Sequence, residues 1–96
     1  MPEKRFPPSD DVLKAFHALR PEVLAEAGCI EYGTAVDLDG VVDGQPAARA
    51  DLVTVVEKWE HPAALRAHLA APHMVAFREK VKDIVTGVEI RVLAPA

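Results

Sequence analysis

The sequence predicts a single α+β domain, and three observations support this prediction. The chain has 96 residues, enough for one small hydrophobic core. Half of the residues are hydrophobic and 27% are charged, which is typical of a packed globular domain rather than a disordered chain. Apolar residues recur at helical spacing in two segments and form β-like runs in three others. We therefore expect one domain over residues 1–96.

A first helix is expected to begin at residues 9–11, where polar and acidic side chains can cap free N–H groups and favour the helix dipole. Apolar residues then recur at helical spacing: Val12, Phe16, Leu19 and Val23. Pro21 removes one backbone donor, so we expect either a kink near this residue or two abutting helical pieces. Gly28 is the expected C-terminal cap.

Two strands and a long loop are expected next. Residues 29–37 alternate in polarity as a strand does, with one side formed by Ile30, Tyr32, Thr34 and Val36. Turn-forming residues predict a hairpin loop over residues 38–50. Residues 52–59 predict a second strand. Its β-forming run lacks clean alternation, which favours cover on both faces.

A second helical region and a last strand complete the pattern. Pro62 occupies the tolerated first position of a helix, and Pro72 breaks and restarts that helix. Residues 88–93 alternate and predict the last strand. One further strand within residues 2–6 would give the order βαββαβ, the ferredoxin-like split βαβ unit. Because that segment is short and polar, we expect the first strand, which is central in this topology, to be short or missing.

Charge and composition exclude several classes of function. Eleven basic and fifteen acidic residues give a net charge of −4 without a basic stripe, which argues against nucleic acid as a partner. No apolar run approaches the roughly 20 residues that span a bilayer, and the N-terminus lacks the apolar core of a secretory signal. The single cysteine, Cys29, suits a reducing compartment and has no neighbour in sequence that would make it a nucleophile. We expect a cytoplasmic protein without a membrane partner.

Four short pieces, in order, resemble the antibiotic biosynthesis monooxygenase (ABM) family: Glu26-Ala-Gly-Cys-Ile-Glu-Tyr32, Val55-Val-Glu-Lys-Trp-Glu60, Ala67-His-Leu-Ala-Ala-Pro-His73, and Phe77. The resemblance implies a ferredoxin-like protomer and a homodimer whose sheets pack face to face as a dimeric α+β barrel. It implies activities that include cofactor-independent quinol oxygenation, haem degradation and isomerisation of small sugar-derived signals. Haem degradation is not expected, since His68 and Arg78 stand where the haem-degrading members carry a tryptophan and a histidine.

Three residues are candidates for catalysis: His68, His73 and Glu57. Histidine, with an unperturbed pKa of about 6.5, suits proton transfer near neutrality, and His68 is expected on the inward side of its helix. A structural, hydrogen-bonded role is the alternative for His68, and capping of the restarted helix is the alternative for His73. Glu57 shares a strand face with apolar residues, so it either pairs with Arg91 or acts as a proton acceptor with a raised pKa. His17 and His61 are expected to be surface or cap residues.

Large side chains suited to hold a planar ring are candidates for substrate binding: Tyr32, Trp59, Phe16, Met74 and Phe77. Core filling is the alternative for Trp59. A metal site is not expected, since a proline separates His68 from His73 and no third ligand is placed by sequence spacing. No nucleotide-binding or iron–sulfur motif is present, so no cofactor is expected.

The favoured hypothesis is a cofactor-independent monooxygenase that oxidises a small aromatic, quinol-like or polyphenolic substrate with O₂. Such a substrate, once deprotonated, can itself pass an electron to O₂, so the protein needs an apolar pocket, a base and donors for the oxyanion. Two alternatives stay open. One is an isomerase of a small hydroxy-ketone or sugar-derived metabolite, and the other is a non-catalytic ligand-binding dimer of the same fold.

Overall fold

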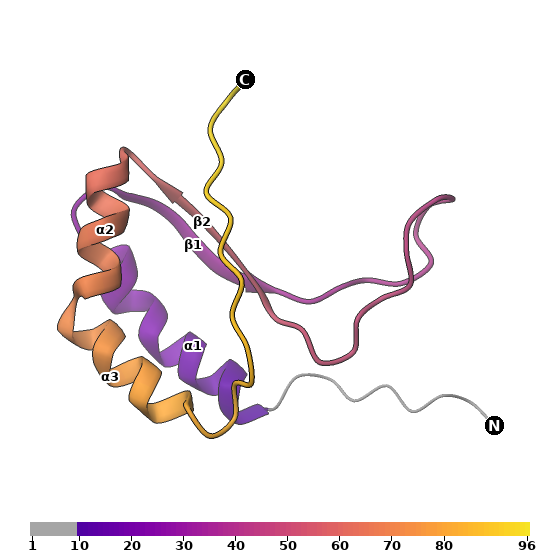
Figure 1. The fold of residues 1–96 in the computed structure, drawn as a ribbon, viewed down its shortest axis with the longest axis horizontal. Helices are drawn as coiled ribbons and strands as arrows, with labels where there is room; N and C mark the ends of the chain where they lie inside the picture. Colours follow the sequence, from indigo (N-terminus) through magenta and orange to yellow (C-terminus); the bar gives the residue numbers. More distant parts are fainter. Residues whose placement is uncertain (1–9) are drawn as a thin grey trace.

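The structure is a computed structural model that describes residues 10–96 (Figure 1). These residues form five elements: α1 (Asp10–Leu24), β1 (Cys29–Ala35), β2 (Thr54–Trp59), α2 (Pro62–Ala70) and α3 (Pro72–Val81). The two strands pair antiparallel as a hairpin; α1 packs on β1, α2 packs on β2, and α3 contacts both other helices. Within this range, no helix has the length and apolar character required to cross a membrane.

α1 is one continuous helix that runs through Pro21. The expected helical spacing is confirmed, because its buried residues are Val12, Ala15, Leu19 and Val23. A division into two helical pieces is not observed. Pro21 is exposed, so its ring lies away from the core. The preceding Arg20 donates from Nε to the carbonyl of Tyr32 at 2.8 Å, which ties the end of α1 to β1.

A β-bulge in β1 changes which side chains face the core. Cys29 pairs with Trp59 and Glu31 with Lys58, so β1 carries one extra residue, Ile30, over this interval. An extra residue in a strand shifts the inward and outward alternation of the side chains that follow it. Tyr32 is therefore only 2% exposed whereas Ile30 is 60% exposed. The prediction that these two residues share one side is wrong for this reason.

Burial alternates along β2, and Glu57 shares a face with apolar residues as predicted. Its inward positions, which are partly buried, are Val55, Glu57 and Trp59, and its outward positions are Thr54, Val56 and Lys58. The expected cover on both faces is not present in the single chain, since Val56 on the outer face is 45% exposed.

The predicted last strand at residues 88–93 does not form a strand in this structure. The segment runs past the hairpin as a single trace (Figure 1) and exposes four apolar side chains: Val88, Ile90, Val92 and Leu93. A strand is stable only beside a hydrogen-bonding neighbour, and the described part of the chain gives this one none. The predicted first strand at residues 2–6 lies outside the described residues.

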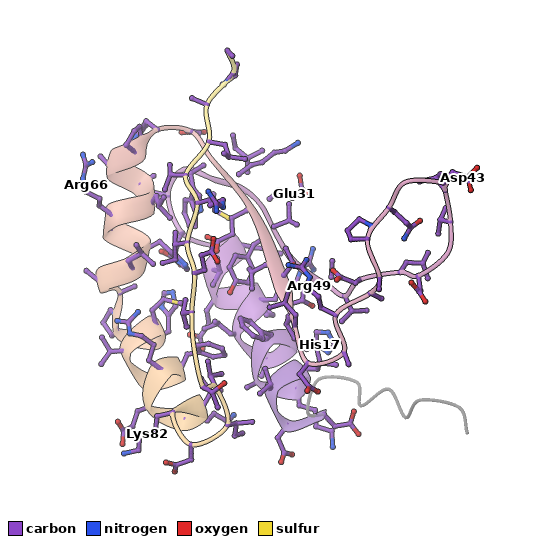
Figure 2. All side chains as sticks on the ribbon, turned by 45° about the vertical axis from the view of Figure 1, so that its right-hand side comes forward. His17, Glu31, Asp43, Arg49, Arg66 and Lys82 are labelled. Carbon is purple, nitrogen blue, oxygen red and sulfur yellow. The ribbon has the colours of Figure 1, made fainter. Side chains whose placement is uncertain are left out.

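The loop between β1 and β2 projects away from the helices, with Asp43 at its tip (Figure 2). Its base is closed by Arg49, which donates from Nε and Nη2 to the carboxylate of Asp37 at 2.7 and 3.1 Å. These hydrogen bonds hold the pKa of Asp37 at about 2. Within the loop, Gln45 Oε1 accepts from the backbone N–H groups of Val41 and Val42, so the turn is organised locally.

The core lies between the helices and the hairpin. It consists of Leu19, Val23, Tyr32 and Met74, with further apolar side chains packed against it: Phe16, Cys29, Val55, Trp59, Ala71 and Phe77. The rings of Phe16 and Phe77 lie with centroids 4.7 Å apart. This contact joins α1 to α3.

Gly28 lies where the chain passes closest to α2. Its φ of +82° is in the left-handed region, and a Cβ built on it would lie 2.7 Å from the Cβ of Ala64. Its carbonyl also accepts a hydrogen bond of 2.8 Å from the N–H of Glu60. Only glycine combines this conformation with this close approach.

We predict that Gly28→Ala lowers the free energy of unfolding by roughly 2–4 kcal/mol, the sum of backbone strain and overpacking. Gly44→Ala is the matched control, because Gly44 has φ +87° but nothing within 4 Å of its added Cβ. It should cost only the strain, roughly 1–2 kcal/mol. Urea denaturation of both variants measures this, and equal losses would contradict the role of the Ala64 contact.

Candidate functional site

A buried histidine on α2 is the centre of the site. His68 is 1% exposed, the most buried polar side chain among the described residues. The N-cap of α2 is His61, whose Nδ1 accepts from the N–H of Ala64 at 3.2 Å. This confirms the expectation of a cap at His61. Ala64 and His68 are the buried residues of α2 and lie one turn apart, so the helix directs the imidazole toward the hairpin.

Glu26, in the turn after α1, joins two helices through one oxygen atom. His68 Nδ1 donates to Glu26 Oε2 at 2.7 Å, and His73 Nε2 on α3 donates to the same oxygen at 2.8 Å. A carboxylate can only accept, so both of these nitrogens carry protons. Burial would raise the pKa of the Glu26 carboxyl, but hydrogen bonds from both histidines and their charges outweigh it, and the pKa is lowered.

The second nitrogen of His68 faces the strand β2. In the neutral ring with a protonated Nδ1, Nε2 carries a free lone pair. Nε2 lies 3.7 Å from Glu57 Oε1, which also accepts from the indole Nε1 of Trp59 at 2.9 Å. The Trp59 ring lies tilted against the imidazole at 4.7 Å, and Tyr32 meets it edge-on at 5.9 Å. The arrangement is a proton acceptor enclosed by aromatic rings, with a carboxylate beside it.

The alternative that Glu57 pairs with Arg91 is wrong. Arg91 Nη2 lies 2.9 Å from Glu89 Oε1. The ion pair would require residues 88–93, which include Arg91, to form a strand beside β2. These residues form no strand here. The Glu57 side chain instead turns inward to Trp59 and keeps 26% of its surface exposed.

Two other polar groups in this region are held in their neutral forms. Burial, and then the charges of Glu57 and Glu26, raise the pKa of Tyr32 far above its ordinary value. Tyr32 is therefore a hydrogen-bond donor and not a base. Burial and the same two carboxylates raise the pKa of the Cys29 thiol, in keeping with the expectation that it is no nucleophile.

The structure brings together five of the predicted site residues: His68, His73, Glu57, Trp59 and Tyr32. The other three predicted residues belong to the adjoining hydrophobic core and not to the immediate surroundings of His68: Phe16, Met74 and Phe77. The surface has a hollow of about 520 Å³ over α1 and the end of α3, but its lining residues do not include His68.

Comparisons with known proteins identify the family of this chain. Residues 7–80 match the profile of the family described as antibiotic biosynthesis monooxygenase, ABM. The chain belongs to this family. It is 43% identical over 84 residues to the proteins named probable quinol monooxygenase YgiN from Escherichia coli and Shigella flexneri, a match that covers 88% of this chain and 80% of each relative.

A crystal structure of a protein from Deinococcus radiodurans, assigned as an antibiotic biosynthesis monooxygenase, shares the fold. The TM-score is 0.59 at 19% sequence identity, and the match covers 92% of each chain. The predicted α+β, ferredoxin-like class is confirmed by this similarity.

Glu26 is the residue of the candidate site that reasoning from the sequence missed. It lies 42 residues before His68 and 47 before His73, so no local spacing connects it with either histidine. The available signal was its position at the start of the first ABM-like piece. Glu26 is also the third possible metal ligand that sequence spacing did not place. Glu26, His68 and His73 each offer one ligand atom, and these atoms lie within 4.8 Å of one another.

We predict that Glu26→Gln lowers the free energy of unfolding by roughly 1.5–3 kcal/mol at neutral pH, since it removes the charge from two charge-assisted hydrogen bonds. The lowered pKa of Glu26 means that its stabilising contribution is present above the ordinary value of 4.5 and is lost as the pH falls below it. The difference between parent and variant should therefore shrink in acid.

Thermal and urea unfolding between neutral pH and pH 3 measure this difference. Glu31→Gln is the matched control, because Glu31 pairs with Lys58 at the surface. It should cost less than about 1 kcal/mol. A Glu26→Gln loss no larger than that of Glu31→Gln would contradict the structural role of the shared carboxylate.

Proposed function

We propose that this protein is a cofactor-independent monooxygenase that oxidises a quinol or a related polyphenol with O₂. One observation carries the proposal: His68 is anchored through Nδ1 to Glu26, while its Nε2 lies 3.7 Å from Glu57 Oε1, against the rings of Trp59 and Tyr32. The names of the YgiN relatives support the same substrate class. Family membership supports monooxygenation as the reaction type.

The first step is removal of a proton from a substrate hydroxyl. A substrate hydroxyl about 2.8 Å from His68 Nε2 would donate its single proton to that nitrogen. Nε2 takes the proton, and the resulting imidazolium is stabilised by the carboxylate of Glu26 at Nδ1. The negative charge of Glu57, 3.7 Å from Nε2, also stabilises the imidazolium, and the flat faces of Trp59 and Tyr32 suit an aromatic ring.

The oxidation balances without another reductant. The quinolate passes one electron to O₂, the two radicals combine to form a carbon–oxygen bond, and the oxygen–oxygen bond then breaks. One oxygen atom stays on the ring and the other leaves as water, so quinol and O₂ give hydroxyquinone and water. All four electrons come from the substrate. The imidazolium of His68 returns its proton to the departing oxygen.

We predict that His68→Ala reduces quinol turnover by roughly 10²–10⁴-fold while the protein stays folded, because proton abstraction limits the chemistry with O₂. Glu57→Gln should keep a melting curve like the parent's and lose most of its turnover. O₂ uptake with a panel of benzoquinols and naphthoquinols measures both, after subtraction of autoxidation without protein. His17→Ala is the matched control, because His17 is exposed on α1.

Full turnover in a well-folded His68→Ala protein would exclude His68 as the base, and His73 would be tested next. Proton exchange into a ketose phosphate without O₂ uptake would instead favour the isomerase. Ligand binding without either reaction would favour a non-catalytic dimer.

We also propose that the protein acts as a homodimer in the cytoplasm and that residues 1–96 form one domain. The outer face of the hairpin exposes Ile30 and Val56, and residues 88–93 expose further apolar side chains. Apolar surface on one sheet face of this kind is usually covered by a partner. A second copy, related by a twofold axis, would cover both sheets at once.

Sedimentation equilibrium at micromolar concentration is expected to give about twice the chain mass of 10.4 kDa. Val56→Lys places a charge on the outer face of β2 and should shift the population toward the monomer. Lys58→Ala, at the next outward position of the same strand, is the control. A stable parent monomer would contradict the proposed assembly.

A further inference from the structure

We propose that Glu26, His68 and His73 form a binding site for a divalent transition metal ion of the zinc class. One carboxylate oxygen and two imidazole nitrogens, from three separate segments of the chain, lie within 4.8 Å of one another. Imidazole and carboxylate are ligands that zinc takes in proteins, and two histidines with one glutamate is a known ligand set for it. The binding proposal does not depend on the proposed oxygenase activity.

The ligand atoms are close to the spacing that an ion requires. They are now joined by hydrogen bonds of 2.7 and 2.8 Å to Glu26 Oε2. Around a tetrahedral zinc ion with bonds of about 2.0–2.1 Å, neighbouring ligand atoms lie roughly 3.3 Å apart. The carboxylate must therefore draw back by about half an ångström from each nitrogen. Glu26 lies in a turn and His73 at the start of α3, where such adjustments are small side-chain movements.

An independent observation points to the same site: the far nitrogen of each histidine faces a carboxylate. His68 Nε2 lies 3.7 Å from Glu57 Oε1, and His73 Nδ1 lies 3.8 Å from Glu22 Oε2. A histidine that ligates a metal almost always donates its other N–H to a carboxylate, a carbonyl or water, which fixes the ring and raises its basicity. Both carboxylates lie within 4 Å of these nitrogens, so small side-chain movements would bring them into hydrogen-bond range.

The burial of the three ligands allows an ion to enter and remain. The His68 side chain is 1% exposed, Glu26 is 14% exposed and His73 is 23% exposed. The ion would approach from the side of His73 and Glu22, whose side chain is 60% exposed. Three protein ligands leave a fourth position for water or another small ligand.

Metal binding has a chemical consequence for His68. An ion at Nδ1 takes the position of the proton that Glu26 now accepts, so a neutral ring must carry its proton on Nε2. Nε2 then donates toward Glu57 and can no longer accept a proton from substrate. If the proposed function holds, zinc binding therefore inhibits the enzyme by changing the tautomer of its base.

The test is isothermal titration of the untagged protein with zinc chloride at neutral pH, together with the visible spectrum of the cobalt(II) form. One ion per chain is expected. Glu26→Gln and His73→Ala should each weaken binding at least tenfold, and Glu22→Gln should weaken it about tenfold through loss of the outer carboxylate. His17→Ala, which removes an exposed histidine outside the cluster, should leave the affinity unchanged.

Absence of zinc binding by the folded parent would overturn the site, and so would equal affinities in the parent, Glu26→Gln and His73→Ala. Circular dichroism of each variant verifies that it is folded, and the use of two partly exposed residues avoids reliance on the buried His68. Zinc titration of quinol turnover tests the inhibition separately. Binding without quinol turnover would leave the metal site supported while the proposed function fails.

Discussion

The arrangement of this molecule depends on two imidazole groups that donate to one carboxylate oxygen. Glu26 Oε2 joins the turn after α1 to α2 through His68 and to α3 through His73. A buried polar side chain is stable only when it is hydrogen-bonded, and Glu26 accepts that bond from Nδ1 of the buried His68. The same contact fixes which nitrogen of His68 carries the proton. Glu26 Oε2 therefore both holds the two helices against the turn and determines which nitrogen of His68 is protonated.

The side chains that surround this contact enclose the site, and they are positioned by features of the backbone. Tyr32 is turned inward because the bulge at Ile30 reverses the alternation of β1, and Trp59 is held by its hydrogen bond to Glu57. Gly28 permits the chain to pass close to Ala64, which brings the turn with Glu26 against α2. Small backbone features thus position the large side chains of the site.

Much of this was predictable from the sequence, and the failures have identifiable causes. Helical spacing located α1 and placed His68 inward on α2, and the two-residue period of a strand placed Glu57 and Trp59 on one face of β2, because these patterns are local. The bulge at Ile30 was not predictable, since strand register depends on the partner. The pairing of residues 88–93 failed because a strand needs a neighbour, which no local pattern supplies. Glu26 was missed because its partners are more than forty residues away in the chain.

The loop between β1 and β2 has a consequence for how freely this protein can be altered. The hydrogen bonds that organise it are internal: Gln45 binds the backbone of the turn, and Arg49 closes the base on Asp37. None of these contacts reaches the histidines or the core. Lengthening a surface loop adds only a slowly rising entropy of closure, roughly 0.6 kcal/mol per doubling. The tip near Asp43 is therefore a natural place to graft a foreign peptide or a fluorescent reporter without changing the chemistry of the site.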